Sequence, residues 1–245
     1  MKPLFALASL LITMSVASSA AETHSAIFQA GNRILFQGDS ITDGARGRNN
    51  DPNHILGHSY AFLVAAKYGA LYPERNLTFF NRGISGNKVP DLLGRWQKDA
   101  VDLKPTVVSI LIGVNDIWHP MLSTNQLVSV EQYEAGYDKL LAETVAVLPD
   151  AKIILLEPFI TPGRATSPKW DAWQEHLKKF QTVVTKLGAK YKAPVVKLQH
   201  VFDEAGKRAP AEYWVWDGVH PTYAGNQLIA DEWVRVAAAT WPTAK

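Results

Sequence analysis

Short apolar runs alternate with longer amphipathic segments along most of the chain. The runs are rich in β-branched and aromatic residues, a composition typical of strands. They predict five strands, at residues 33–37, 77–81, 106–112, 152–157 and 194–198. Because the runs are continuously apolar rather than alternating, we expect strands that are buried on both faces, as in a parallel sheet.

The longer segments repeat apolar residues at the spacing of a helix. They predict helices at residues 60–68, 89–101, 130–148, 170–191 and 223–239. Strands and helices in this order, joined by right-handed crossovers, give a three-layer α/β/α sandwich that binds ligands at the carboxyl ends of its strands. Residues 158–168 are rich in Thr, Pro and Gly and are expected to form a loop at the rim of that face.

The N-terminal segment, residues 1–21, departs from this pattern. Lys2 precedes an apolar run over residues 4–16, and small residues follow it. A positive start, a short apolar region and a small-residue exit are typical of a secretory signal peptide, with a buried N-terminal helix as the alternative. We expect cleavage near Ala20 or Ala21 and a secreted or periplasmic protein.

The remaining residues, 22–245, have the length of one α/β domain. Apolar residues make up 47% and charged residues 20% of the chain, so a packed core is expected. The absence of Cys excludes disulfides, thiol nucleophiles and a thiol-linked lipid anchor, so no membrane anchor is expected. A formal net charge of +2 gives no reason to expect nucleic acid as a partner, and the oligomeric state is left open.

Four segments rich in glycine and polar residues lie at residues 38–42, 82–86, 113–116 and 216–221. In the first of them, Ser40 follows a predicted strand, where its hydroxyl is exposed above the sheet but needs a base to become a nucleophile. His220 is a candidate base, and Asp217, three residues earlier, can accept a hydrogen bond from its ring. Taken singly, Ser40 can equally cap a helix, and His220 can be a loop histidine with a local partner.

Acyl transfer also needs hydrogen-bond donors for the oxyanion that develops on the carbonyl. The sequence offers the backbone N–H groups of Ser40 and Gly83 and the side-chain amide of Asn115. Asn115 follows the most apolar predicted strand, where a buried amide without a partner is costly. The alternative for Asn115 is an Asx-turn that ends the strand.

In this order and with their neighbours, Ser40, Gly83, Asn115 and His220 resemble the four sequence blocks of the SGNH (GDSL) hydrolase superfamily. Within it the chain is most similar to serine acetylxylan esterases and related carbohydrate deacetylases, through FQGDSITDGAR, NRGISGNKVPDLLGRWQKD, VSILIGVNDIW and WDGVHPTYAGNQLIA. The resemblance runs from about residue 33 to the last predicted helix.

This resemblance implies a flavodoxin-like five-stranded parallel sheet, ester hydrolysis and no cofactor. It carries over Ser40 as the nucleophile, with Asp217 and His220 as the rest of a catalytic triad. It also carries over Gly83 and Asn115 as oxyanion donors beside the N–H of Ser40.

Two tryptophans lie beside these blocks: Trp118 follows Asn115 by three residues, and Trp216 precedes the predicted acid. Flat indoles cover the apolar C–H faces of sugar rings, so both are expected to bind substrate. The expected substrate is an acetylated carbohydrate such as xylan or xylo-oligosaccharides. Trp170 and Trp173, on a helical segment, are expected in the core.

Three other functions stay open on the sequence: a lipase-like or thioesterase member of the same superfamily, a noncatalytic carbohydrate-binding module, and a metal-dependent deacetylase. His54 and His58 are four residues apart with Asp51 nearby, but no Glu base accompanies them. A loop on the substrate side is favoured there, and no metal is expected.

Overall fold

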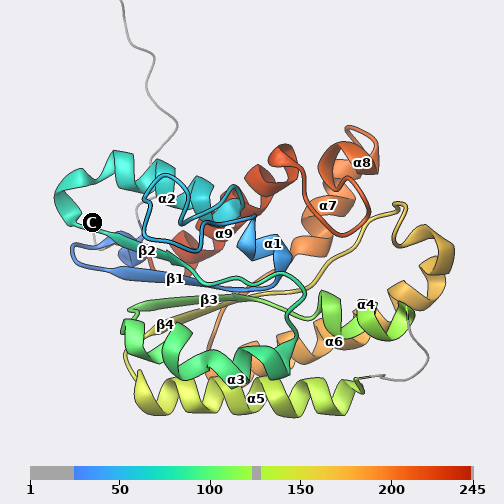
Figure 1. The fold of residues 1–245 in the computed structure, drawn as a ribbon, viewed down its shortest axis with the longest axis horizontal. Coiled ribbons are helices and arrows are strands. Elements are labelled where there is room, and N and C mark those ends of the chain that lie inside the picture. Colours follow the sequence, from blue (N-terminus) through green and yellow to red (C-terminus); the bar gives the residue numbers. More distant parts are fainter. Residues whose placement is uncertain (1–24, 123–127, 244–245) are drawn as a thin grey trace, which may run out of the picture.

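The computed structural model describes residues 25–122 and 128–243, so the predicted signal peptide, residues 1–21, lies outside the described residues. Within this part of the chain, five strands form a parallel sheet in the order β2-β1-β3-β4-β5 (Figure 1). They are β1 (Arg33–Gly38), β2 (Thr78–Asn81), β3 (Val107–Leu111), β4 (Lys152–Leu156) and β5 (Val195–Val196). All five lie at the predicted positions, although β5 is short because Leu198 already begins a helix.

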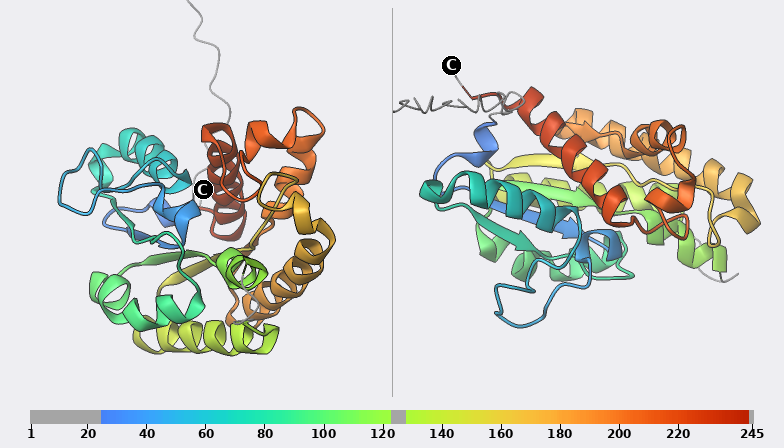
Figure 2. Two further views of the ribbon diagram at one scale, coloured as in Figure 1. Left: turned by 45° about the vertical axis from the view of Figure 1, so that its right-hand side comes forward. Right: turned by 90° about the horizontal axis from the view of Figure 1, so that it is seen from above.

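Helices lie on both sides of the sheet (Figures 1 and 2). On one side are α2 (Tyr60–Leu71), α7 (Leu198–Gly206), α8 (Ala211–Trp214) and α9 (Tyr223–Thr240). On the other are α3 (Val89–Asp99), α5 (Val130–Val147) and α6 (Trp170–Tyr191). Two further helices, α1 (Ser40–Asp43) and α4 (Val114–Leu122), follow β1 and β3, and 3-10 turns lie at Ala26–Phe28, Pro73–Arg75, Val101–Leu103 and Ser167–Lys169. The predicted three-layer α/β/α sandwich is confirmed.

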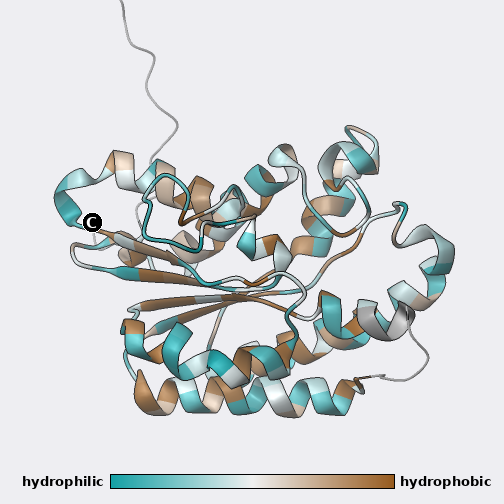
Figure 3. Cartoon of the chain, in the orientation of Figure 1, coloured by the Kyte–Doolittle hydropathy of each residue, from teal (hydrophilic) through white to brown (hydrophobic). Residues whose placement is uncertain are grey.

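The sheet is apolar on both faces, as the continuous apolar runs predict (Figure 3). β3 is buried along its whole length, and β1 is buried after its first residue. Trp233 of α9 is fully buried, and its indole N–H donates a hydrogen bond to Ser109 Oγ of β3 (3.0 Å). Burial of large side chains between the layers stabilises the sandwich. Among the described residues, no helix is both long and apolar enough to span a membrane.

The strand order determines where a ligand can bind. From β1 the chain crosses to β2 on one side and then to β3 on the other side of β1. Such a reversal opens a crevice at the carboxyl ends of the two flanking strands, the usual ligand site of this sheet type. Gly38 pairs with Leu111 at the ends of β1 and β3, so α1 and α4 begin side by side. The fold therefore brings Ser40 and Asn115 to the same edge.

Candidate active site

Ser40 is the first residue of α1, close behind β1. The side chain of Asp39 caps this short helix by accepting a hydrogen bond from the N–H of Ile41 (3.0 Å). No described residue accepts a hydrogen bond from the backbone N–H of Ser40. Ser40 therefore offers both a hydroxyl and an unused N–H at the carboxyl edge of the sheet.

The structure brings Ser40, His220 and Asp217 together in one chain of hydrogen bonds. Ser40 Oγ lies 2.9 Å from His220 Nε2, and His220 Nδ1 lies 2.8 Å from Asp217 Oδ2. Because the carboxylate accepts the proton on Nδ1, the neutral ring has its lone pair on Nε2, facing the hydroxyl. These are the distances that a hydroxyl, its base and the group that orients the base require.

Asp217 is held rigidly in the loop that precedes α9. Its Oδ1 accepts hydrogen bonds from the backbone N–H groups of Val219 (2.9 Å) and His220 (2.8 Å). Burial raises the pKa of Asp217, but the hydrogen bonds from the His220 ring and from these two N–H groups outweigh it and bring the pKa below its usual range. The group is therefore an anion at neutral pH and can stabilise a positively charged imidazole.

Asn115 lies in the first turn of α4 and is buried. One N–H of its amide donates a hydrogen bond to the carbonyl of Asn87 (3.2 Å). An amide nitrogen carries two N–H donors, so the second stays available. The bond ties the segment after β3 to the segment after β2 and fixes the amide in position.

The sequence prediction for Gly83 does not agree with the geometry. Its backbone N–H donates a hydrogen bond to the side-chain oxygen of Asn81 (3.0 Å) and is therefore not free for an oxyanion. A Cβ at Gly83 would lie 2.4 Å from the backbone nitrogen of Asp43, which is closer than real contacts allow. Glycine is thus needed at position 83 because α1 packs directly on this backbone.

Gly86, three residues further on, has the free backbone N–H that the sequence led us to expect at Gly83. No described residue accepts a hydrogen bond from its N–H, and a Cβ built there would meet nothing within 4 Å. Its φ of +81° favours glycine. It also directly precedes Asn87, whose carbonyl holds Asn115. The two glycines cannot be told apart in the sequence, because the choice depends on where the Asn81 side chain binds.

The rings of Trp118 and Trp216 both lie close to the His220 ring. The ring centroid of Trp118 is 5.7 Å from that of His220, and the centroid of Trp216 is 6.5 Å away in a stacked arrangement. Trp216 is half exposed, and the Arg164 guanidinium lies 4.3 Å from its ring. Trp173, in contrast, is buried, as its helical position predicts.

Two buried carboxyls adjoin the site. Asp39 precedes Ser40, and Asp116 follows Asn115. Burial raises the pKa of each to about 7, although each accepts a backbone hydrogen bond that lowers it. One oxygen of each carboxyl, Oδ2, is buried without a hydrogen-bond partner. Both groups therefore favour the protonated form over the mildly acidic range.

These raised pKa values predict that the contribution of Asp39 and Asp116 to stability falls as the pH rises. Between pH ~4 and ~7 the folded state retains protons that the unfolded state releases, so the free energy of unfolding falls by roughly 1.4 kcal/mol per pH unit for each carboxyl. Asp116→Asn should remove about half of this slope, as measured by denaturant unfolding at several pH values. The exposed Asp150→Asn is the control. An unchanged slope in Asp116→Asn would contradict the assignment.

His54 and His58 do not belong to a cluster of potential metal ligands in the described part of the chain. His54 Nε2 lies 3.7 Å from Asp51 Oδ2, and both groups are solvent-exposed. Within residues 25–122 and 128–243, no group of three His, Cys, Asp or Glu side chains is placed to hold a metal ion. The segment is a loop beside α1, where the His58 N–H donates a hydrogen bond to the carbonyl of Gly44 (2.9 Å).

The fold and this arrangement of side chains define a class of ester hydrolases. The GDSL-like lipase/acylhydrolase family matches residues 36–228, and the chain belongs to this family. It is a carboxylic ester hydrolase. The flavodoxin-like strand order and the superfamily resemblance predicted from the sequence are both confirmed.

The chain is similar over most of its length to individual proteins of known structure. The acetylxylan esterase of Geobacillus stearothermophilus is 34% identical over 218 residues, which cover 86% of this chain and 96% of that protein. Its solved structure has a TM-score of 0.76 at 33% identity, covering 86% of this chain and 95% of that one. A GDSL-like protein of Parabacteroides merdae has a TM-score of 0.81 at 38% identity, covering 86% and 97% of the two chains. Catalytic mutants of the Geobacillus enzyme replace a serine, an aspartate and a histidine, the last two three positions apart.

Proposed function

We propose that this protein is an exported serine esterase that removes acetyl groups from carbohydrates such as xylan or xylo-oligosaccharides. The observation that carries the proposal is the hydrogen-bonded chain from Ser40 through His220 to Asp217, with two indoles close to the His220 ring. Ser40 is the nucleophile, His220 the general base and Asp217 the group that orients it.

Acylation begins when Ser40 Oγ attacks the ester carbonyl and its proton passes to His220 Nε2. The tetrahedral oxyanion is stabilised by the N–H groups of Ser40 and Gly86 and by the free amide N–H of Asn115. His220 then gives the proton to the departing alcohol oxygen of the sugar, which leaves an acetyl ester on Ser40. A water molecule then attacks this ester while His220 Nε2 takes its proton. When the bond between Ser40 Oγ and the acetyl carbon breaks, His220 returns this proton to Ser40 Oγ, and acetic acid leaves and ionises to acetate.

Three further observations support these roles. The aspartate and histidine replaced in the catalytic mutants of the Geobacillus enzyme have the same spacing as Asp217 and His220. That relative is named an acetylxylan esterase. The exposed indole of Trp216 beside the base offers a flat apolar surface of the kind that sugar rings cover.

Export and domain organisation are part of the same proposal. Residues 1–21 act as a signal peptide that is removed near Ala20 or Ala21, and residues 22–245 form a single hydrolase domain. N-terminal sequencing of the protein recovered from the periplasm or medium tests the cleavage site. An N-terminus that retains Met1 in that fraction would contradict it.

A panel of esters tests the substrate class. We expect acetate release from acetylated xylan and xylo-oligosaccharides, and p-nitrophenyl acetate hydrolysis with a higher kcat/KM than the octanoyl ester. The competing function is a lipase-like or thioesterase activity on longer acyl chains. Preference for octanoyl over acetyl esters, with no acetate released from xylan, would favour that function.

Trp216 provides a prediction specific to the sugar. Trp216→Ala should lower kcat/KM for acetylated xylo-oligosaccharides about fivefold to tenfold more than for p-nitrophenyl acetate, because only the sugar covers the indole. Phe62→Ala, an exposed aromatic on α2, is the matched control. Equal losses on the two substrates would indicate a packing defect and contradict a sugar contact.

A further inference from the structure

Arg95 is a partly buried arginine of α3 whose side chain reaches the carboxyl ends of β1 and β2. Its side chain is 15% exposed. Burial lowers the pKa of the guanidinium, and the hydrogen bond from Nη1 to Asp99 (3.2 Å) opposes this shift. Nη1 also lies 3.0 Å from Oε1 of the buried Gln37. A cation removed from water needs acceptors for its N–H groups, so the identity of these acceptors shows which segments the side chain connects.

The guanidinium binds segments that follow two different strands. Nε donates a hydrogen bond to Oδ1 of Asn87 (2.8 Å). Nη1 lies 2.8 Å from the carbonyl oxygen of Arg82, which directly follows β2. Nη2 lies 3.4 Å from the carbonyl oxygen of Gly38, the last residue of β1. One side chain therefore joins the end of β1 to the segment after β2.

The segment after β2 forms a tight turn that contains Gly86, whose N–H we propose as an oxyanion donor. The N–H of Asn87 donates a hydrogen bond to the carbonyl of Ile84 (3.1 Å), which closes the turn. The N–H of Ile84 in turn donates to the carbonyl of Gly38 (3.1 Å), the same oxygen that Arg95 approaches. Arg95 thus holds the far end of the turn through the Asn87 side chain and lies at the oxygen that anchors its near end.

The other two oxyanion donors are connected to the same guanidinium. Asn87 accepts a hydrogen bond from Arg95 through its side chain and one from the Asn115 amide through its backbone carbonyl (3.2 Å). Because this carbonyl orients the amide, it also sets the direction of the second amide N–H. Gly38 lies two residues before Ser40, whose backbone N–H is the third donor. Each donor is therefore close along the chain, or through one hydrogen bond, to a residue that Arg95 binds.

We propose that Arg95 is a positioning residue for ester hydrolysis: its guanidinium fixes the relative positions of the three oxyanion donors. The inference rests on the proposed function, because it concerns the same site. Among the described residues, neither Ser40 nor His220 is a hydrogen-bond partner of Arg95, so it acts through the segments it binds. Oxyanion donors stabilise a transition state only when they are preorganised. Lysine has the same charge but lacks the planar fork that reaches several acceptors at once.

Arg95→Lys tests this role with p-nitrophenyl acetate. We expect kcat to fall about 10-fold to 10²-fold, the effect of misplacing catalytic groups by about 1 Å, with little change in KM. Rates are expressed per Ser40 that a fluorophosphonate labels at completion, which removes the contribution of unfolded protein. Arg235→Lys, an exposed arginine of α9 paired with Glu232, is the matched control and should keep the wild-type constants. An unchanged kcat in Arg95→Lys would overturn the inference.

A double-mutant cycle with Asn115→Ala separates positioning from a general structural role. If Arg95 acts through the donors, its replacement costs less once one donor is gone. We therefore expect Arg95→Lys/Asn115→Ala to be severalfold faster than the product of the two single losses predicts. Losses in kcat that simply multiply would show that Arg95 acts independently of Asn115 and would overturn the inference.

Asn87→Ala decides the matter if Arg95→Lys fails to fold. It removes the acceptor of Arg95 Nε but keeps the backbone carbonyl that holds Asn115. We expect kcat to fall severalfold with KM unchanged, and an unchanged kcat would overturn the inference. Ser40→Ala is measured in parallel. An active Ser40→Ala would contradict the proposed function, whereas an inactive Ser40→Ala beside a fully active Arg95→Lys would overturn this inference alone.

Discussion

Ser40→Ala is expected to lower kcat for p-nitrophenyl acetate by about 10⁴-fold to 10⁶-fold, because it removes the nucleophile while the oxyanion donors remain. Ser40 is only partly buried and its hydroxyl contacts His220, so the fold should persist. Initial rates with the ester measure the effect, and circular dichroism with thermal melting checks the fold.

The double variant Ser40→Ala/His220→Ala provides the internal control for this expectation. Groups that act as one unit are not additive, so the double variant should be about as slow as Ser40→Ala alone. Near-normal turnover in Ser40→Ala, or a further large loss in the double variant, would contradict a shared nucleophile-base unit.

Asn115→Ala is expected to lower kcat by about 10²-fold to 10³-fold, equivalent to about 2.7–4 kcal/mol, with little change in KM. The reason is that the amide donates a hydrogen bond to the negatively charged oxygen of the transition state and contributes little to binding the neutral ester. Asn53→Ala, in an exposed loop, removes an amide of the same kind away from the site and serves as the control.

The split between kcat and KM decides the role of Asn115. Its amide also holds the Asn87 carbonyl, so a purely structural role would lower the melting temperature and affect both constants. A rise in KM alone, with kcat unchanged, would contradict the role as oxyanion donor.

The strands could be predicted because two-sided burial makes each one a continuous apolar run. The start of α4 could not be predicted, because Gly113 and Asn115 are also typical of a turn that ends a strand. In the structure the chain instead continues directly into a helix at Val114. Helices α7 and α8 are short, with 9 and 4 residues, and carry too few turns for a clear helical period.

Some residues of the candidate site could also be identified from the sequence, and others could not. Ser40, Asp217 and His220 could be named from the sequence because each lies in a distinctive local block, and the structure joins them. The choice between Gly83 and Gly86 as oxyanion donor could not be made from the sequence, because it depends on the hydrogen bond from the Gly83 N–H to the Asn81 side chain.

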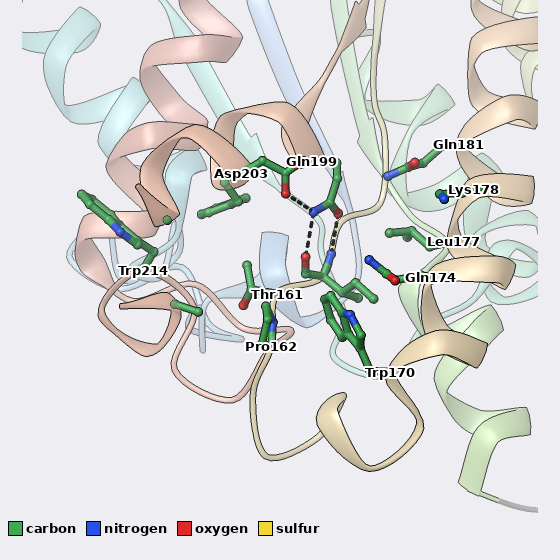
Figure 4. Close-up of a pocket in the computed structure, with 14 residues that line it drawn as sticks. Thr161, Pro162, Trp170, Gln174, Leu177, Lys178, Gln181, Gln199, Asp203 and Trp214 are labelled. Atoms are coloured by element: carbon green, nitrogen blue, oxygen red, sulfur yellow. Dashed lines mark hydrogen bonds between the residues drawn. The ribbon is translucent and has the colours of Figure 1, made fainter. Parts of the chain in front are cut away.

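The sequence also gives no indication of the cavity that lies next to the loop after β4 (Figure 4). Its walls come from the loop after β4, α6, α7 and α8, segments that meet only in the folded chain. Trp170 illustrates the difficulty. Its helical spacing predicts a core residue, and only half of that expectation holds, because it is partly buried but also lines a cavity.

Covalent labelling with a fluorophosphonate, read by peptide mass spectrometry, tests whether Ser40 is the nucleophile. We expect one adduct, on the peptide that contains Ser40, with loss of esterase activity in step with labelling and protection by acetylated xylo-oligosaccharides. Ser40→Ala should remain unlabelled. An adduct on another residue, or full activity after Ser40 is labelled, would show that Ser40 is not the nucleophile.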